Sequence, residues 1–147
     1  MAAATMVIGA LDAEMKAAFG ISHFDHALLL ILSSHPRRQA RMGDIARSMN
    51  LEPSNISHRV KRLERAGLLE RRPDPADGRA TYARLTPRGM RLLRDAWPVH
   101  RDGIRRHFLD HIDPARLDAV AEVFGAICES KLPAERRRGQ SAGASPS

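Results

Sequence analysis

The sequence predicts a mainly α-helical (α+β) protein, a winged helix-turn-helix with a β-hairpin wing and additional N- and C-terminal helices. Three observations support this fold class. Two short helical patterns lie on either side of a tight turn between residues 44 and 67. Two β-prone runs follow directly and are separated by a turn-rich segment. Stretches with apolar residues at helical spacing flank this centre on both sides, and each needs a surface on which to bury its apolar face.

The N-terminal part of the chain predicts two helices. Ala4–Phe19 has apolar residues spaced in threes and fours, and Gly20 is placed to end this helix. Ser22–Asp25 resembles a capping box in which Asp replaces the usual Glu. The run Ala27–Leu32 is apolar on all sides, which predicts a central buried helix rather than a surface helix.

The helix-turn-helix itself comes next. Residues 44–49 have helical spacing, and Asn50-Leu51 forms a turn. Pro53 suits the first position of a second helix, where a missing N–H and a fixed φ are tolerated. Gly67 is placed to end that helix. Four apolar residues repeat at helical spacing along it and form its inner face: Ile56, Val60, Leu63 and Leu68.

Two runs rich in strand-forming residues predict a hairpin after the second helix. They are Leu68–Arg72 and Ala80–Leu85, and the turn-rich segment Pro73–Gly78 joins them. A basic hairpin that follows a helix-turn-helix is a wing. Arg41-Met42 is a candidate short strand that pairs with this wing.

The C-terminal part predicts two more helices and a tail. Thr86-Pro87 combines a capping hydroxyl with proline at the first helical position, and the helix should run to about His111. Pro98 lies inside it and is expected to kink or break it. Asp113-Pro114 opens a last helix, and residues 133–147 lack periodicity and are expected to be disordered. The apolar face of the last helix contains Leu117, Val120, Ala121, Phe124 and Ile127.

Composition indicates the class of partner and the compartment. The net charge of +7 and the pI near 10.9 favour polyanionic partners. No apolar run approaches the roughly 20 residues that cross a bilayer. The N-terminus lacks the basic region of a signal peptide, so we expect a cytoplasmic location. The single cysteine, Cys128, suits a reducing compartment and follows an apolar stripe, which predicts a buried, inert thiol.

Short motifs in the central region carry a resemblance to a known family. In order, they are Pro53-Ser54, Leu63-Glu64, Gly67-Leu68, Glu70-Arg71, Asp77-x-Arg79 and Leu85-Thr86. Together they resemble the MarR family of bacterial regulators, over about residues 4–131. The resemblance implies one domain over residues 1–132. Within it the winged helix covers about 22–86, and dimerisation helices cover 4–20 and 87–131.

The resemblance also implies a function. MarR-like proteins are homodimers whose terminal helices pack together. A symmetric dimer presents two helices to successive major grooves of palindromic double-stranded DNA, with half-sites about one turn, ~34 Å, apart. We therefore expect a transcriptional regulator, a repressor relieved by a small ligand.

The predicted second helix supplies most of the candidate DNA contacts, because the N-terminal part of such a helix enters the groove. Asn55 can pair with adenine, Ser57 can bond to base edges or phosphate, and Lys61 suits phosphate. A solvated surface residue is the alternative at each position. His58 and Arg59 depart from the family's usual residues, so the operator sequence cannot be inferred from relatives. The candidates on this helix are Ser54, Asn55, Ser57, His58, Lys61 and Arg62.

The wing adds further candidates. Arg79 matches the family arginine that reaches the minor groove, and Asp77 is expected to fix the loop that presents it. Three other arginines are candidate phosphate contacts, and an ordinary charged hairpin face is the alternative: Arg71, Arg72 and Arg84. Arg62 and Glu64 are alternatively internal ion-pair residues, as they usually are in the family.

Many relatives bind aromatic carboxylates or phenols between the dimerisation helices and the winged helix. Trp97, His100, Ile104, His107 and His111 share one stripe of the long predicted helix. The candidate pocket for a small aromatic or anionic effector comprises His23, His26, Arg106, His107 and His111. A zinc site using His107 and His111 is an alternative, and a polar rim of the dimer interface is another.

Other function classes find less support. The sequence has no Gly-rich phosphate loop, nucleophile elbow or H-E-x-x-H motif, so we expect neither an enzyme nor a cofactor. A winged helix used as a protein-interaction adaptor is the main rival. Steep loss of affinity with salt distinguishes the two, because a protein that neutralises phosphates releases counterions.

Overall fold

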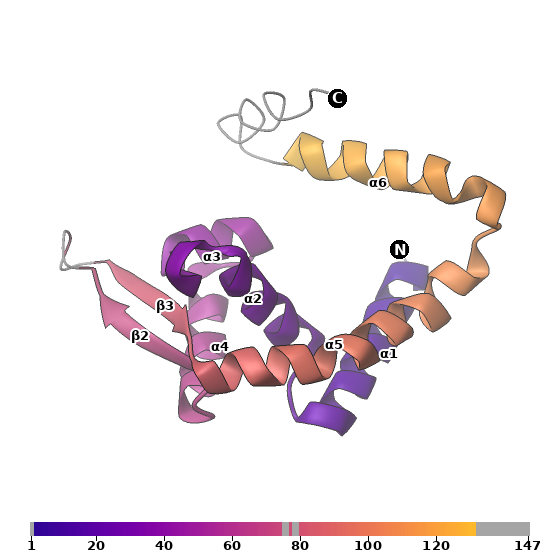
Figure 1. Cartoon of the computed structure of the whole chain (residues 1–147). Coiled ribbons are helices and arrows are strands. Elements are labelled where there is room, and N and C mark those ends of the chain that lie inside the picture. The colour runs from indigo at the N-terminus through magenta and orange to yellow at the C-terminus, as the bar shows by residue number, and fades with distance from the viewer. Residues whose placement is uncertain (1, 75–76, 78–79, 132–147) are drawn as a thin grey trace, which may run out of the picture. The chain divides into compact units, whose positions relative to one another are not determined.

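The computed structural model describes residues 2–74, 77 and 80–131, with side chains up to residue 127 (Figure 1). The chain divides into two compact units, residues 1–108 and 109–147. The first unit contains, in order, α1 (Ala2–Phe19), α2 (His23–Ser34), a 3-10 turn η1 (Pro36–Arg38), β1 (Gln39–Arg41), α3 (Met42–Met49), α4 (Pro53–Arg65), β2 (Leu69–Pro73), β3 (Thr81–Leu85) and α5 (Pro87–His107). The second contains η2 (Leu109–His111), η3 (Pro114–Arg116) and α6 (Leu117–Lys131). The predicted mainly helical winged helix-turn-helix is confirmed.

The helix-turn-helix forms as the local signals predict. Asn50 adopts a left-handed conformation, φ 51°, and its N–H donates to carbonyls of the last turn of α3. Pro53 is the first residue of α4. Gly67, with φ 71°, follows the end of α4, and the N–H of Leu68 donates to the carbonyl of Leu63 at 2.9 Å. These bonds satisfy carbonyls that the end of a helix leaves without partners.

Three antiparallel strands form the wing sheet, in the order β1-β3-β2. Ala40 lies opposite Ala83, and both side chains are buried. The first strand was predicted at Arg41-Met42. Arg41 is in the strand, but the strand begins two residues earlier, at Gln39, and ends one residue earlier. Met42 begins α3 instead, with Arg41 as its N-cap, because burial of Ala40 sets the register one step earlier.

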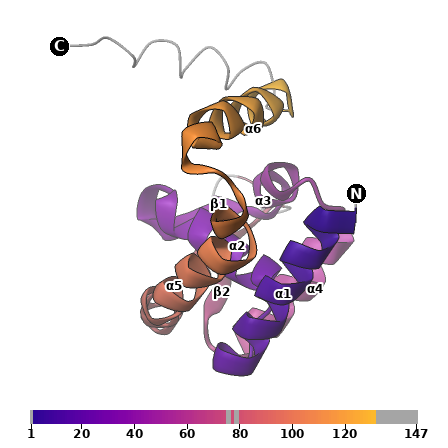
Figure 2. The same ribbon diagram turned by 90° about the vertical axis from the view of Figure 1, so that its right-hand side faces the viewer.

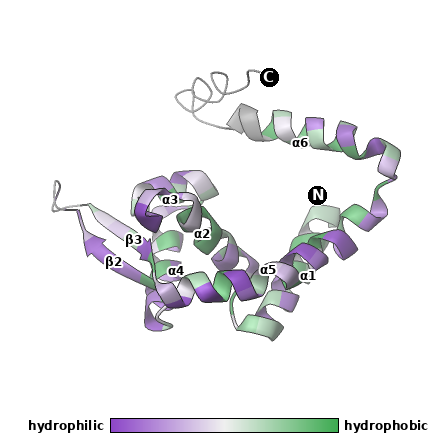
Figure 3. Ribbon diagram, viewed as in Figure 1, coloured by the Kyte–Doolittle hydropathy of each residue, from purple (hydrophilic) through white to green (hydrophobic). Residues whose placement is uncertain are grey.

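Helix α2 is the centre of the hydrophobic core and is largely apolar along its length (Figure 3). Leu28, Leu29 and Leu32 are fully buried and pack in the same cluster as the inner face of α4. The expectation that α2 is buried on all sides is wrong along one side, where Ala27 and Ile31 are only partly buried. Leu30 is 39% exposed, because one side of the helix remains open to solvent.

Helix α1 packs against α5 (Figure 2). Leu11 and Met15 are the buried residues of its predicted apolar stripe, whereas Ile8 is 39% exposed. The N-terminal end of α1 therefore keeps apolar surface, including Met6 at 73% exposure.

Helix α5 begins at the predicted signal, since the hydroxyl of Thr86 accepts a hydrogen bond from the N–H of Gly89 at 3.0 Å. It then runs through Pro98 to His107, so of the predicted kink or break, the break does not occur. Proline removes only one backbone donor, and its ring here is exposed, while Ala96 and His100 on either side are buried. The helix also ends four residues before the predicted His111.

The second unit begins with short turns. The side chain of Asp113 accepts from the N–H of Ala115 at 3.0 Å, and a 3-10 turn at Pro114 precedes α6. Apolar side chains on α6 are exposed within this unit, including Val123 at 58%. The predictions for the Cys128 thiol and the tail 133–147 lie outside the described residues. In the described part of the chain, no single helix has the length and apolar composition of a membrane span.

Candidate nucleic-acid interface

Helix α4 presents a polar face to solvent. Its inner residues Ile56, Val60 and Leu63 are at most 1% exposed. This packing orients the side chains between them outward. All six predicted contacts on this helix are exposed, and among them only Arg62 forms an ion pair with another described residue: Ser54, Asn55, Ser57, His58, Lys61 and Arg62. Hydroxyl, amide and ammonium groups on an exposed helix face are the groups that read base edges and contact phosphate.

An open hollow of about 470 Å³ lies where the helix-turn-helix meets the wing. Ser57 of α4, Arg47 of α3, and Arg71 and Thr81 of the wing are among the residues that line it. The guanidinium of Arg47 is paired with Asp44 at the surface. The hollow therefore joins the polar face of α4 to basic side chains of α3 and the wing on one side of the molecule.

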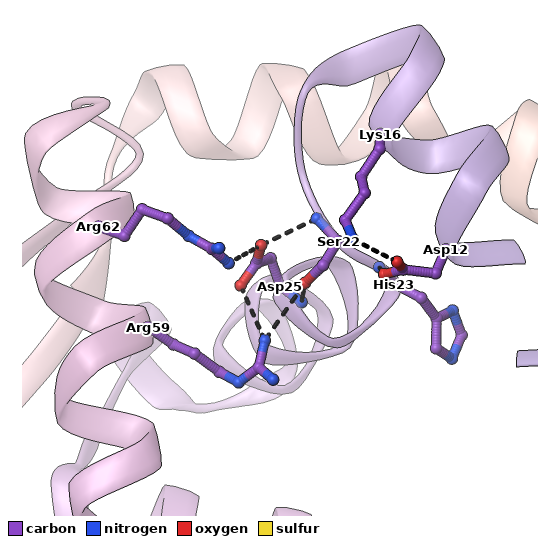
Figure 4. Close-up of polar contacts among 7 residues, drawn as sticks. All are labelled: Asp12, Lys16, Ser22, His23, Asp25, Arg59 and Arg62. Atoms are coloured by element: carbon purple, nitrogen blue, oxygen red, sulfur yellow. Dashed lines mark hydrogen bonds and ion pairs between the residues drawn. The ribbon is translucent and has the colours of Figure 1, made fainter. Parts of the chain in front are cut away.

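The carboxylate of Asp25 ties α4 to the start of α2 (Figure 4). Asp25 is 1% exposed and accepts the N–H of Ser22 at 2.9 Å, while the Ser22 hydroxyl accepts the N–H of Asp25 at 3.0 Å. Arg62 donates to one carboxylate oxygen, and Arg59 approaches the other at 3.4 Å. The predicted capping box is therefore present, and its acid also holds two arginines of α4.

The ionisation of Asp25 follows from these contacts. Burial acts to raise its pKa, but hydrogen bonds from Arg62 and Ser22 outweigh burial and hold the pKa below the ordinary 3.8. Arg62 was predicted to contact DNA or, alternatively, to form an ion pair within the protein. It forms the ion pair, with Asp25. The guanidinium of Arg59 also lies over the ring of Phe24, 5.1 Å from its centroid.

The candidate phosphate contacts of the wing are also paired. Arg71 donates to Glu64 at 2.9 Å, so Glu64 is an internal ion-pair residue as predicted. Arg72 and Arg84 both approach Glu70, at 3.0 and 3.5 Å. All of these pairs are substantially exposed, and exposed pairs contribute little free energy. A phosphate can therefore replace the carboxylate at small cost.

The base of the wing loop contains a contact that sequence reasoning missed. Asp74 is 4% exposed and binds Arg41 of β1 at 2.5 Å, while the Arg41 Nε donates to the Tyr82 hydroxyl at 3.3 Å. The N–H of Asp74 donates to the carbonyl of Ala80 at 2.9 Å. A correct register for the first strand, with Arg41 opposite Tyr82, would have predicted the contact of Arg41 with the base of the wing loop. Arg79, the predicted minor-groove contact, lies outside the described residues.

Three histidines form a cluster between α2 and α5. The ring of His100 lies 4.3 Å from that of His26 and 5.2 Å from that of His23. Both ring nitrogens of His26 and one on each of the others are buried without a hydrogen-bond partner among the described residues. Burial, together with His100 and His23, lowers the pKa of His26 to about 4. The cluster is therefore neutral at pH 7.

The residues of the predicted effector pocket have different partners. His23 and His26 meet His100, whereas Arg106 and His107 both bind Glu14 of α1, at 2.8 Å each. Those hydrogen bonds from Arg106 and His107 lower the pKa of Glu14. His111 belongs to the second unit. Within residues 2–74, 77 and 80–131, no group of three or more His, Cys, Asp or Glu side chains could hold a metal ion.

Acidification should destabilise the protein through the histidine cluster. In the unfolded chain His26 titrates near 6.5, but in the folded protein its pKa is about 4. Between these values the unfolded chain binds the extra proton, so the free energy of unfolding falls as the pH drops from 6.5 to 4, by roughly 3 kcal/mol. Asp25 loses its contribution only below pH 3.8, outside this window.

Urea unfolding between pH 7.5 and 4 measures this effect. His26→Phe keeps a flat ring at the position and removes its titration, so the variant should show a much shallower pH dependence than the wild type. Equal slopes for both proteins would show that another group controls acid stability.

Comparison with known proteins places this geometry among DNA-binding regulators. A family model described as the MarR family matches residues 19–80. The chain is 33% identical over 89 residues to the uncharacterised HTH-type transcriptional regulator YkoM of Bacillus subtilis, covering 60% of this chain and 56% of that protein. It is 31% identical over 81 residues to the HTH-type transcriptional regulator MhqR of B. subtilis, covering 55% and 54%. The matched regions thus span about half the length of these curated relatives.

Solved structures match over more of the chain. Sco3205 from Streptomyces coelicolor, a MarR family regulator in complex with DNA, is 33% identical with a TM-score of 0.82, covering 90% of this chain and 83% of that one. AbsC, a MarR family regulator from the same organism, is 29% identical with a TM-score of 0.78, covering 87% and 86%. CouR from Rhodococcus jostii, bound to p-coumaroyl-CoA, is 26% identical with a TM-score of 0.71, covering 85% of each chain.

Proposed function

The chain belongs to the MarR family of DNA-binding transcriptional regulators, which are not enzymes, and from this premise we propose that it is a homodimeric repressor of a palindromic operator. The observation that carries the proposal is the polar outer face of α4 beside a hollow lined by arginines of α3 and the wing. Its place of action is the chromosome, in the cytoplasm.

The contacts divide by chemistry. Asn55 and Ser57 read base edges in the major groove, and Lys61 binds phosphate. Arg79 reads the narrow minor groove beside it. Arg72 and Arg84 exchange Glu70 for phosphate when DNA binds, because their exposed pairs with Glu70 are weak.

The dimer is supported by apolar surface on the terminal helices. Met6 of α1 is 73% exposed, and within the second unit Leu117 and Val123 of α6 are 37% and 58% exposed. Exposed apolar side chains of this size fit a protein interface. Two subunits related by a two-fold axis then place two α4 helices on half-sites one turn apart.

Relief by a small effector is the second part of the proposal. Two structural neighbours are described with small aromatic compounds: CouR is bound to p-coumaroyl-CoA, and DNA binding by BpsR of Bordetella bronchiseptica is regulated by 6-hydroxynicotinic acid. We propose an aromatic or anionic effector of the same chemical kind for this chain. The region between α2 and α5, where His23, His26 and His100 lie, is the candidate site.

Selection of bound fragments from genomic DNA tests the proposal directly. The purified protein should recover a palindrome with half-sites about one helical turn apart. Binding should weaken steeply with salt. Recovery without any common sequence would contradict a specific operator, and no recovery at all would revive the adaptor alternative.

Two variants of α4 should separate base reading from phosphate binding. Asn55→Ala should cost about 1–3 kcal/mol on the selected operator, the scale of one bidentate base contact, and should leave binding to unrelated duplex unchanged. Lys61→Gln, the matched control, should weaken binding to both duplexes alike and reduce the salt dependence. Fluorescence anisotropy measures both. If Asn55→Ala weakens both duplexes equally, Asn55 does not read a base.

A further inference from the structure

The wing sheet has a second charged face, on the side away from the core. Ala40 and Ala83 are buried and lie opposite one another, so their side of the sheet faces the core. Side chains in the alternate positions point the other way. Six residues form this outer sheet face: Gln39, Arg41, Glu70, Arg72, Tyr82 and Arg84.

An open hollow of about 580 Å³ lies on the outer sheet face. Arg37 from η1 and Arg72 from β2 line it, together with Gln39, Pro73, Asp74 and Tyr82. The charged groups around it are four guanidinium groups, of Arg37, Arg41, Arg72 and Arg84, and two carboxylates, of Glu70 and Asp74. The excess of positive charge favours an anionic partner.

Two of these arginines are available to such a partner. Arg37 is exposed and has no ion-pair partner among the residues that the structure describes. Arg72 is paired with Glu70, but the two side chains are 56% and 40% exposed, and a pair of this kind exchanges easily. Arg41, in contrast, is held by the buried carboxylate of Asp74.

The backbone around Arg37 is strained. Arg37 and Arg38 both have left-handed conformations, with φ of 56° and 55°, which residues other than glycine seldom adopt. The N–H of Arg38 donates to the carbonyl of His35 at 2.9 Å, and that of Gln39 donates to Pro36, so the turn is held in place. Strain that the surrounding structure maintains is concentrated at functional positions.

The shape of a DNA groove indicates which part of the duplex the outer sheet face contacts. A hairpin that enters a groove lies between two sugar–phosphate backbones. The inner side of the wing, with Arg71 and Thr81, shares its hollow with α4. We propose that the outer sheet face binds the backbone on the opposite side, through Arg37 and Arg72, and so extends the contact to duplex that flanks the half-site. This inference rests on the proposed function.

A pair of duplexes and a double variant test it. One duplex is the selected operator trimmed to its two half-sites, and the other carries about ten further base pairs, one helical turn, at each end. The variant combines Arg37→Asn with Arg72→Gln, because Asn tolerates a left-handed backbone. Wild-type protein should bind the extended duplex more tightly, and the variant should bind both alike. On the extended duplex, the slope of log affinity against log salt should fall by about 3.6, since the dimer loses four phosphate contacts and each contributes about 0.9.

A control variant with the same change in net charge shows whether the effect depends on the position of the arginines. Arg94→Gln with Arg101→Gln removes two exposed arginines from α5 and should keep the preference for the extended duplex. The inference is overturned if wild-type protein binds both duplexes equally. It is also overturned if the Arg37/Arg72 variant still binds the extended duplex more tightly than the trimmed one. The outer sheet face would then be a candidate site for an acidic protein segment instead of DNA. Failure of wild-type protein to bind either duplex would contradict the proposed function instead.

Discussion

Replacement of Gly89 by alanine is expected to destabilise the protein by about 3 kcal/mol or more, the upper part of the range for overpacking. A Cβ at this position would lie 2.2 Å from the carbonyl oxygen of Leu68 and 2.7 Å from Cδ1 of Leu85. The Leu68 carbonyl cannot move away easily, because it accepts hydrogen bonds from both the N–H and the hydroxyl of Thr86, at 3.1 Å each. The start of α5 must therefore separate from the base of the wing.

Urea unfolding followed by circular dichroism measures the loss. Gly43→Ala is the matched control, since Gly43 also lies in a helix of the first unit but has no atom within 4 Å of an added Cβ. The control should be as stable as the wild type or more stable by up to about 1 kcal/mol. An unchanged midpoint for Gly89→Ala would mean that α5 and the wing are not in the contact described.

Asp25→Ala is expected to cost about 3 kcal/mol, the lower end of the range for removing one partner of a buried ion pair. The carboxylate is 1% exposed, and its loss removes the acid of the α2 capping box together with the partner of two arginines. The cost stays at the lower end because the Arg62 side chain is 58% exposed and can be hydrated. Operator affinity should also fall, since the N-terminal turn of α2 no longer holds α4.

The control for Asp25→Ala is Asp44→Ala. Asp44 pairs with Arg47 at the surface, with side chains 40% and 73% exposed, so its removal should change the free energy of unfolding by less than about 0.5 kcal/mol. Both proteins are compared by urea unfolding and by operator titration. Equal stability of the two variants would show that the buried carboxylate contributes no more than an exposed one.

Signals that act within a few residues were predictable from the sequence. The capping box at Ser22–Asp25, proline at the start of α4, Gly67 after its end and Thr86 before α5 each satisfy backbone groups locally, and all are present. The polar face of α4 was predictable for a similar reason, because the spacing of its apolar residues determines which side is buried.

Features that depend on distant packing were not predictable. The exposure of Leu30 and the presence of Pro98 inside α5 both depend on which elements pack around each helix. The spacing of apolar residues along one helix does not contain this information. The bonds of Arg106 and His107 to Glu14 join residues more than 90 positions apart, which local spacing does not reveal. In the sequence, nothing marks Gly89 as a special position in its helix. Its importance follows only from the structure, in which the Leu68 carbonyl lies close to it.

Among the strands that the structure describes, the order β1-β3-β2 leaves both outer strands of the wing with one open side. Such a side can add a strand from another molecule, which is a common start of aggregation. Here β1 has only three residues, and β2 ends in Arg71-Arg72-Pro73, where two charges and a residue without an N–H oppose further pairing. We therefore expect the arginines that suit the wing to a polyanion also to oppose sheet pairing between neighbouring copies. Neutralising them therefore affects solubility as well as binding.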